Sequence, residues 1–503
     1  MVALSGGGFR AMTGSMVIAR ALATAPGGSL WPQVTTLASN SGGSWFTSMF
    51  INDAAFQGTI LDGATPLSSV VATWGTNYSH SLATHQQGIP AWVPITDKEI
   101  CKAFDSTVQG VASTAFSLQT VPKYWQPYVA AVLDATSPEL VERLGAGAVR
   151  PGQIAATLVQ VMSLPPDAYV LSSSGVRGAE SLMVDGHTVD YAVPLGFAID
   201  ADGSAMWMHN AQVQLTLADG TSVHPAPLQT NLTIGTLSAA SSAALGFASS
   251  PAMIGQVIPS WLSWLIASCT ETLGLDGAAI PTDGAPLGVA VFPPSYRFID
   301  GAYTDNSGAA MGLAALLGEC AGGAASSAAP CYPTPRLIIV DHDAASGNAG
   351  TSRKLFRAPA GTATSSLPCA TSPPSSPCTD GGGAITHWSA AQSGQLAPLA
   401  TIFDADYPAA STFVPYSSAS SDYWSGELTT AANSWYGVPA GQRVHVLLIR
   451  LKTSQPEVPP LTYQLTTPSR VQAFAQLFTN TYAGGVDAQV SLLGPVLQAF
   501  LRG

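Results

Sequence analysis

Charged side chains are scarce in this sequence. Only 10% of the 503 residues are Asp, Glu, Lys or Arg, against roughly 25% in ordinary soluble domains. The 18 Lys and Arg are outnumbered by 30 Asp and Glu, which gives a formal net charge of -12. No basic stripe is left to neutralise phosphates, so we expect no nucleic-acid partner and no polybasic membrane anchor. The 47% hydrophobic content supplies a large core and argues against disorder.

Three patterns with a known structural meaning are also missing. No stretch reaches the roughly 18 uninterrupted apolar residues of a membrane-spanning helix, and residues 253–268 come nearest. The first residues show no signal-peptide pattern, which is typical of a mature form or of a fragment without its leader. No C-x-x-C pair or EF-hand loop is present. We therefore expect neither a metal ion nor another cofactor.

Cysteine is also sparse. The six cysteines are Cys101, Cys269, Cys320, Cys331, Cys369 and Cys378. Four of them form two close pairs that bracket small-residue loops, which suits disulfides in an oxidising compartment, although free buried thiols fit the same spacing. Two glycosylation sequons, at Asn77 and Asn231, point the same way but also arise by chance. These signals slightly favour a secreted or lumenal location over a cytoplasmic one and leave the localisation open.

The first 45 residues predict one β-α-β unit. Residues 2–4 read as a strand, and a glycine loop (Gly6-Gly7-Gly8) follows. Apolar residues then recur at steps of three and four, as on one face of a helix, and residues 34–38 read as a second strand. A second small-residue turn, residues 39–44, comes next. Because parallel strands end at the same edge of a sheet, we expect both turns to lie at the carboxyl edge, where open α/β folds bind ligands.

The same alternation returns later in the chain. Residues 297–300 and 337–340 read as strands of the parallel sheet, with a helix over 309–317 between them. A last strong strand is expected at 444–451, followed by a helix near 488–501. The middle of the chain shows helical patches and strand patterns, such as residues 211–217, but no separate motif.

The glycine loop can bind negative charge. Glycines let a backbone approach a ligand closely, and N–H groups at a helix N-terminus attract anions. Residues 6–11 also satisfy the G-x-G-x-x-A dinucleotide fingerprint, which requires an acidic residue about twenty positions on. No Asp or Glu precedes Asp53, so the dinucleotide alternative is disfavoured.

Ser41 is the candidate nucleophile. In G-x-S-x-G elbows, a serine sits on a tight strand-to-helix turn whose small neighbours let a substrate reach the hydroxyl. Gly42 and Gly43 follow Ser41, whereas Ser39 has Ser41 itself at the second following position. An ordinary Ser/Gly turn is the alternative. The glycine loop one β-α-β unit earlier favours the elbow, because the two turns would face one another.

Four motifs in order resemble one enzyme family. Residues 5–12 (SGGGFRAM) look like the oxyanion motif of the group IV cytosolic phospholipase A2 and fungal lysophospholipase (phospholipase B) family, which is related to patatin. Residues 41–45 (SGGSW) resemble its nucleophile motif. Residues 298–302 (FIDGA), with Asn306 and a helix after them, resemble its catalytic-aspartate motif. Residues 337–343 (LIIVDHD) are similar to the strand that follows.

The resemblance implies a fold and a set of roles. The fold is a three-layer α/β/α arrangement with a mainly parallel central sheet and inserted cap or lid segments. Ser41 and Asp300 form a Ser-Asp dyad, Gly6, Gly7 and Gly8 form the oxyanion hole, and Arg10 contacts the substrate phosphate. No metal is implied. The function is a phospholipase A2/B or lysophospholipase that cleaves fatty-acyl esters of glycerophospholipids through an acyl-serine intermediate.

The resemblance also implies a domain organisation. Residues 1–503 form one elaborated catalytic domain. Its core motifs lie in 1–50 and 286–345, an insertion or cap occupies roughly 51–285, and residues 346–503 form a variable C-terminal part. The partners are a phospholipid or lysophospholipid and the surface of a membrane or micelle. The Trp-rich residues 253–268 read either as an interfacial helix or as a core helix.

The sequence departs from the family at two places. Ser39 and Asn40 stand where the family has Gly and Leu, so a β-carbon crowds the elbow and an amide replaces an apolar side chain. Asp300 is followed by Gly301 and Ala302, which is neither the patatin nor the usual phospholipase version. Activity is expected, and substrate preference stays open.

Three alternatives stay open. A triad would join Ser41 to Asp300 or Asp341 and to His387 or His445; the last alternates within an apolar strand, as a core residue does. A patatin-type hydrolase of neutral glycerolipids or galactolipids, or an acyltransferase, would use the same acyl-enzyme. A catalytically inactive lipid-binding relative would keep the fold without the reaction.

Overall fold

The computed structural model describes part of the chain. The described residues are 1–85, 129, 132–133, 169–177, 182–184, 187–189, 192–199, 206–209, 215–216, 222–223, 238, 241–242, 298–301, 305–322, 334–342, 351–357, 388–390, 396–398, 400–417, 421–433, 436, 438–451 and 483–503. Several predictions lie outside them: residues 253–268, His387, Asn231 and every cysteine except Cys320, which falls in a helix.

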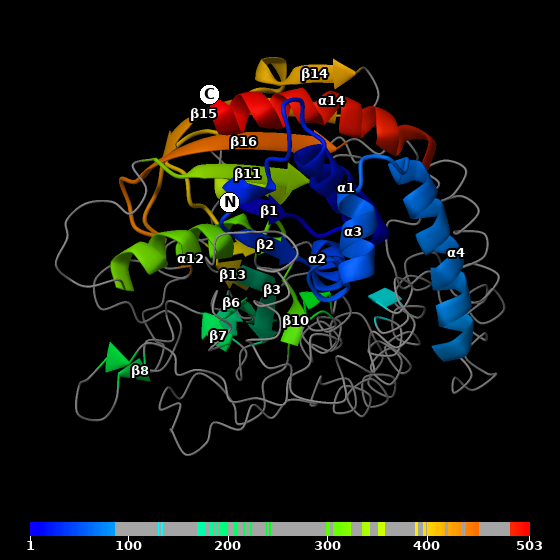
Figure 1. Ribbon diagram of the computed structural model, residues 1–503. Helices are drawn as coiled ribbons and strands as arrows, with labels where there is room; N and C mark the ends of the chain where they lie inside the picture. The colour runs from blue at the N-terminus through cyan, green and yellow to red at the C-terminus, as the bar shows by residue number, and fades with distance from the viewer. Residues whose placement is uncertain are drawn as a thin grey trace, which may run out of the picture.

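Five parallel strands form the centre of a ten-stranded sheet (Figure 1). Their spatial order is β16 (Arg443–Leu451), β11 (Arg336–Asp341), β1 (Val2–Leu4), β2 (Leu37–Asn40) and β3 (Tyr169–Arg177). Each neighbouring pair in this series is parallel. The expectation of an α/β protein is confirmed, and the expected parallel sheet is present as the five central strands of a larger mixed sheet.

Antiparallel strands extend both sides of this centre. On one side β16 pairs with β15 (Ser421–Thr429), which pairs with β14 (Val414–Ser417). On the other side β3 pairs with β6 (Ala192–Ile199), which pairs with β7 (Met206–His209). Three two-stranded sheets complete the described strands: β4 (Leu182–Val184) with β5 (His187–Val189), β8 (Leu215–Thr216) with β9 (Ser222–Val223), and β12 (Trp388–Ala390) with β13 (Leu396–Pro398).

Helices cover both faces of the parallel strands. One face packs against α1 (Gly8–Ala23), α2 (Gly42–Asn52), α3 (Ala54–Leu61), α4 (Leu67–His85) and α14 (Ala483–Arg502). The other face packs against α12 (Ala309–Gly322). Alternate strand residues divide accordingly: Val2 and Leu4 join the first core, whereas Ala3 joins the second, as the two-residue period of a strand requires.

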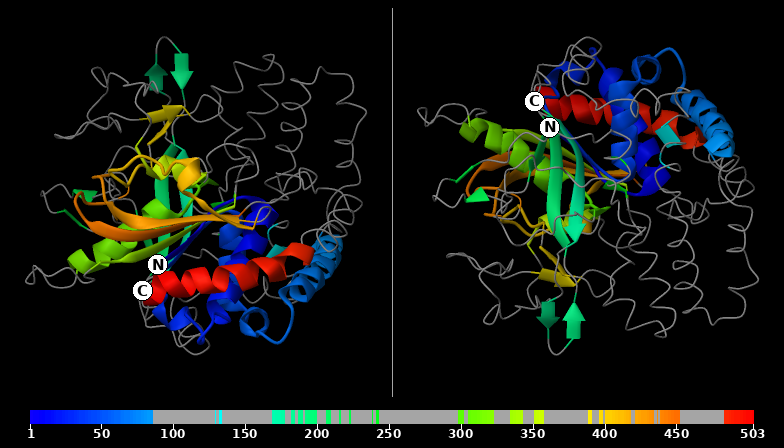
Figure 2. Two further views of the ribbon diagram at one scale, coloured as in Figure 1. Left: turned by 90° about the horizontal axis from the view of Figure 1, so that it is seen from above. Right: turned by 90° about the horizontal axis from the view of Figure 1, so that it is seen from below.

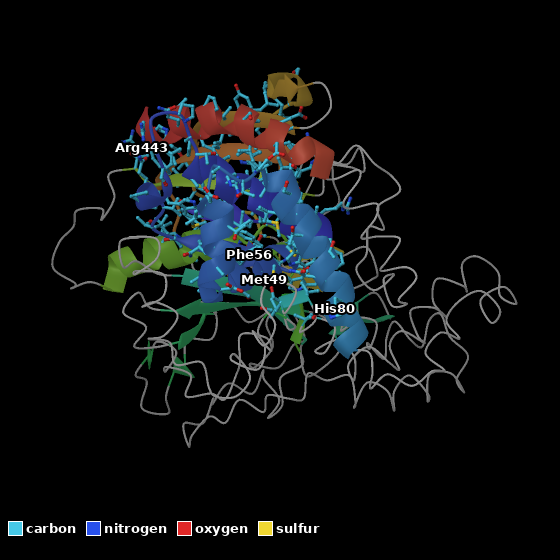
Figure 3. The ribbon with its side chains drawn as sticks, turned by 45° about the vertical axis from the view of Figure 1, so that its right-hand side comes forward. Met49, Phe56, His80 and Arg443 are labelled. Atoms are coloured by element: carbon cyan, nitrogen blue, oxygen red, sulfur yellow. The ribbon has the colours of Figure 1, made fainter. Side chains whose placement is uncertain are left out.

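The first of these cores is rich in aromatic and long apolar side chains. Both views of Figure 2 show α14 beside α1 and α4, although it is the last element of the chain. The Asp487 carboxylate of α14 accepts a hydrogen bond of 2.7 Å from the N–H of Leu67 at the start of α4. Figure 3 shows Met49 and Phe56, both buried, inside this region. Burial of this kind is the main source of stability in such a fold.

Two strand predictions need correction. The second strand is Leu37–Asn40 rather than 34–38, because a short 3-10 helix (η1, Trp31–Gln33) precedes it and residues 34–36 connect the two outside the strand. The strand predicted at 297–300 is β10 (Phe298–Asp300), and it pairs with β3 in the antiparallel rather than the parallel sense. Periodicity reports a strand but not its direction.

The remaining element predictions fall close to the structure. The helix after the glycine loop is α1, the helix predicted at 309–317 is α12, and the strand at 444–451 is β16. Two further short 3-10 helices are η7 (Thr351–Leu355) and η8 (Ala410–Thr412). Among the described helices, none has both the length and the hydropathy to cross a membrane.

Candidate active site

The two small-residue turns follow β1 and β2, next to the point where the chain switches from adding strands on one side of β1 to adding them on the other. From β1 the chain adds β2 and β3 on one side, and later adds β11 and β16 on the other. The boundary between β1 and β11 is therefore the topological switch point, and ligands of open α/β sheets bind at the carboxyl ends of the strands there. The glycine loop follows the carboxyl end of β1, and Ser41 follows that of β2. The predicted meeting of the two turns is observed.

The glycine loop adopts backbone angles that favour glycine. Gly7 has a φ of 139° and Gly8 a φ of 59°, both in the left-handed half of φ/ψ space. Gly7 is the N-terminal cap of α1, whose first turn carries no acidic side chain. The N–H of Gly6 donates to the carbonyl oxygen of Asn306 at 2.8 Å, which engages this amide. Of the three predicted oxyanion-hole residues, Gly6 thus has its amide committed elsewhere.

Ser41 has a strained backbone. With φ 49° and ψ -120°, it is the one non-glycine residue of positive φ in the described part of the chain. It joins β2 to α2, which is the strand-to-helix position of a nucleophile elbow. A residue in such a sparsely populated region costs of order 1–3 kcal/mol, and such residues cluster at active sites. Ser41 is buried, with 7% of its surface exposed.

The elbow and the glycine loop touch directly. A Cβ on Gly42 would overlap the carbonyl oxygen of Gly8, and a Cβ on Gly6 would lie 2.9 Å from the Cβ of Ser41. Neither position has room for a side chain. The contact places the Ser41 side chain beside the loop whose amides would face an oxyanion.

Asp300 lies at the end of β10 that meets β2. Asn40 of β2 pairs with Ser173 of β3, and Asp300 pairs with the next residue, Ser174, on the same edge. The backbones of Asp300 and of the residue preceding Ser41 are thus one step apart along β3. The predicted proximity of the two motifs is therefore present in the backbone.

The turn after Asp300 is fixed by hydrogen bonds. The N–H of Gly301 donates to the carbonyl oxygen of Ser241 at 3.2 Å, and the N–H of Asp305 donates to that of Gly301 at 2.8 Å. The Asp305 carboxylate accepts from the N–H of Ala310 at 2.9 Å, at the start of α12. Burial raises the pKa of Asp305, and the hydrogen bonds that its carboxylate accepts, first from the Ser307 hydroxyl and then from backbone N–H groups such as that of Ala310, oppose that rise.

Ser39 and Asn40, where the sequence departs from the nucleophile motif that it resembles, have polar partners. Both Ser39 and Asn40 are buried. The Asn40 amide donates to Asn306 Oδ1 at 2.9 Å and accepts from the Ser241 hydroxyl at 3.3 Å. The Ser39 hydroxyl lies 3.3 Å from that of Ser44. An amide can therefore stand where the family has an apolar side chain, because this core supplies donors and acceptors for it.

Ser241 and His342 were missed by sequence reasoning. Ser241 lies in a small-residue stretch with Ser238 and Ser242, and serines at steps of three and four in an apolar stretch were the signal available for it. His342 follows β11, and its backbone N–H donates to the Ser5 hydroxyl at 2.9 Å. Its Nδ1 lies 3.1 Å from the same hydroxyl. Nothing in the sequence pairs residues 337 positions apart.

His342 is a neutral imidazole behind the glycine loop. Burial lowers its pKa to about 4, and the positive charge of Arg10 adds a smaller decrease that the Asp341 carboxylate opposes. Its Nε2 is buried without a hydrogen-bond partner. Arg10 is a partly buried residue in the first turn of α1, directly after the loop, as predicted.

The triad alternative with His445 is not supported by the geometry. His445 is half-exposed, with Nε2 3.2 Å from Glu427, rather than a core residue. It pairs with Arg336 near the amino end of β11, whereas Leu4 and Ser39 lie level with Ile449. Four residues of strand, about 13 Å at 3.3 Å per residue, separate these levels.

The Asp341 carboxylate is buried and hydrogen-bonded to a serine of the following 3-10 helix. The Asp341 carboxylate accepts hydrogen bonds from the N–H and the hydroxyl of Ser352, at 3.2 and 2.8 Å. No cluster of three His, Cys, Asp or Glu side chains suited to a metal ion occurs among the residues that the structure describes.

Comparisons with known proteins give little further guidance. No family model and no curated protein matches the sequence. A solved structure of human GIVD cytosolic phospholipase A2 aligns with the whole of this chain at 13% identity, with a TM-score of 0.42. The chain spans 59% of the length of that structure's chain.

Proposed function

We propose that the protein is a lipid acyl hydrolase of the phospholipase A2/B or lysophospholipase type, with Ser41 as nucleophile. The observation that carries this proposal is the strained Ser41 on a strand-to-helix turn that abuts the glycine loop. A serine hydroxyl on a strained turn beside a loop of backbone amides is an arrangement that acyl transfer uses. The order of the four sequence motifs supports the same family and its catalytic-domain fold over residues 1–503.

Asp300 is the proposed general base. It would take the proton of Ser41 as the hydroxyl attacks the ester carbonyl, and return it to the leaving alcohol. The acyl group would stay on Ser41 until a water molecule, deprotonated by Asp300, releases the fatty acid. The pairing of Asn40 and Asp300 with consecutive residues of β3 supports this dyad at the level of the backbone.

Gly7 and Gly8 are the proposed oxyanion-hole donors. Their amides belong to a loop in contact with the elbow, and loss of one such donor typically slows a reaction by about 10²–10³. Gly6 would shape the loop, since its own N–H is bonded to Asn306. Arg10 would bind the phosphate of the substrate, because it is the first cation after the loop.

The proposed substrates are zwitterionic or neutral lipids at a membrane or micelle surface. The net charge of -12 opposes attraction to strongly anionic membranes. A patatin-type hydrolase of neutral glycerolipids would use the same dyad and oxyanion hole and would not need Arg10. Turnover of phosphatidylcholine against a galactolipid, in wild type and Arg10→Ala, separates the two.

The test of this function is covalent labelling of the serine. A fluorophosphonate probe is applied to wild type, to Ser41→Ala and to Ser425→Ala, which removes an exposed serine on β15. We expect labelling and fatty-acid release from phosphatidylcholine and lysophosphatidylcholine to be lost only in Ser41→Ala. Labelling that survives in Ser41→Ala would contradict the assignment. Labelling without any lipid turnover would favour another ester as substrate.

A further inference from the structure

Ser241 contacts both halves of the proposed dyad through the backbone. Its hydroxyl accepts a hydrogen bond from the N–H of Ser41 at 3.0 Å. Its carbonyl oxygen accepts one from the N–H of Gly301, the residue after Asp300, at 3.2 Å. Ser241 itself is fully buried. A single residue, 200 positions from Ser41, therefore joins the elbow to the turn that follows Asp300.

The hydrogen bonds around Ser241 have a defined direction. Its one hydroxyl proton goes to Asn40 Oδ1 at 3.3 Å, because an amide oxygen can only accept. Ser44, 3.0 Å away, must then donate to Ser241, and Ser39 must donate to Ser44. Asn40 continues the series by donating to Asn306 Oδ1. Aligned bonds of this kind strengthen one another, so the Ser241 hydroxyl is held with one orientation.

This orientation matters because of the strain at Ser41. A non-glycine residue at φ 49° and ψ -120° persists only where its surroundings over-determine its conformation. Gly42 has no side chain, which avoids a clash with Gly8 but does not restrain the backbone of Ser41. The Ser241 hydroxyl restrains this backbone. It accepts a hydrogen bond from the N–H of Ser41 and so limits rotation about the N–Cα bond, which defines φ.

Neighbouring serines show what a purely structural role looks like. The Ser238 hydroxyl lies 2.5 Å from that of Ser48, and the Ser242 hydroxyl accepts from the indole N–H of Trp45 at 2.9 Å. Both side chains form hydrogen bonds with buried side chains of α2, and these two hydrogen bonds do not involve Ser41. Ser238 is thus a matched control for Ser241: the same residue type, equally buried, on the same segment.

We propose that Ser241 is a positioning residue for the reaction of Ser41 and Asp300. It fixes the strained amide of Ser41 with its side chain and the turn after Asp300 with its carbonyl group. The inference rests on the proposed function, because it assigns a role within that reaction. It also gives Ser39 and Asn40 a purpose, as parts of the hydrogen-bond series that orients Ser241.

The experiment compares Ser241→Ala and Ser241→Cys with Ser238→Ala and Ser41→Ala. Cysteine nearly preserves the shape of serine but is a weak acceptor, so it guards against a variant that fails to fold. For each protein we would measure kcat and KM for lysophosphatidylcholine, the rate of fluorophosphonate labelling, and the midpoint of thermal unfolding.

The expected result is a fall of about 10- to 100-fold in kcat and in labelling rate for both Ser241 variants, from the loss of an oriented hydrogen bond at the nucleophile. KM should stay within about twofold, since no substrate contact changes. Ser238→Ala should keep kcat within about twofold, even where its thermal midpoint falls as much as that of Ser241→Ala.

Three results would overturn the inference. One is unchanged kcat and labelling in the Ser241 variants, and another is an equal fall in kcat for Ser238→Ala at an equal loss of stability. The third is failure of both Ser241 variants to fold, because positioning predicts folded but slow proteins. Labelling that persists in Ser41→Ala would instead refute the proposed function, so the two failures are distinguishable.

Discussion

The turn after β1 and the turn after β2 lie against each other but reach unusual backbone angles by different means. In the first, Gly7 and Gly8 adopt positive φ at little cost because they have no Cβ. In the second, Ser41 adopts a φ of 49° with a Cβ present, and its N–H donates a hydrogen bond to the side chain of Ser241. Glycine suffices where a turn supplies only backbone amides. A turn that must present a hydroxyl needs support from its surroundings.

Replacing Ser41 by glycine would make the two turns alike, and it is expected to have the largest effect. Ser41→Gly should lower esterase activity by about 10⁴-fold or more, since the nucleophile is gone. It should also raise the free energy of unfolding by about 1 kcal/mol, because the strained φ becomes an ordinary one for glycine. Chemical denaturation and lipid hydrolysis measure the two effects.

Ser41→Ala is the control for this prediction. It removes the hydroxyl and keeps the Cβ, so it should lose the activity without the gain in stability. An equal gain in both variants would show that the backbone of Ser41 is not the source of strain.

Gly42→Ala tests the contact between the turns. The added methyl would overlap the carbonyl oxygen of Gly8, so elbow and glycine loop would have to separate. We expect the free energy of unfolding to fall by about 3 kcal/mol and kcat by about 100-fold. Denaturant titration and steady-state kinetics give the two values. A folded variant with wild-type kcat would show that the two turns need not touch.

The pH dependence of stability tests whether His342 is buried and neutral next to the glycine loop. Its pKa is about 4 in the folded protein and about 6.5 when unfolded, so the unfolded state takes up its proton first as the pH falls. Its contribution to stability is complete above pH 6.5 and is lost between pH 6.5 and 4, by about 3 kcal/mol in total. Denaturant titrations at pH 7.5, 5.5 and 4.5 measure this slope.

His342→Gln isolates the histidine from other titrating groups. The variant has no proton to take up at this position, so its stability should fall less steeply over the same pH interval. Identical slopes for wild type and variant would contradict the buried, neutral state of His342.

The smallest expected effect is that of Gly58→Ala, on α3. A Cβ at this exposed helical position meets nothing within 4 Å, in contrast to Gly42. Alanine should therefore raise the free energy of unfolding by about 0.5–1 kcal/mol through its higher helix propensity. A loss of stability, measured by thermal unfolding, would mean that glycine is needed here for a reason other than space.

Local patterns in the sequence predicted much of this site. Residues 2–4, the glycine loop and α1 follow one another within 23 residues, so periodicity and turn chemistry were enough to predict them. The place of Ser41 on a strand-to-helix turn was predicted in the same way, from its small neighbours. Features that depend on chain direction or on distant partners were not predictable. The antiparallel sense of β10, the bond from Ser41 to Ser241 and the contact between Ser5 and His342 all belong to this group.

Asn40 shows where sequence reasoning loses information. From the sequence alone, the Asn40 amide beside Ser41 is expected to be unfavourable, because no hydrogen-bond partner for it can be identified. In the structure its partners are Asn306 and Ser241, which are 266 and 201 positions away. A buried polar residue is favourable or unfavourable according to such partners, and only the folded chain brings them together.

The shared edge of β3 has a consequence for how this chain can change in length. Because Asn40 and Asp300 pair with Ser173 and Ser174, one residue step of a single strand sets the spacing of the two motifs. Insertions or deletions in the connections outside β3 and the Ser238–Ser242 stretch leave that step unaltered. One residue inserted between Ser173 and Ser174 would instead move β10 by about 3.3 Å and reverse the face of every later residue. The spacing of the two motifs is thus set at one step of β3, and a change of length there alters it directly.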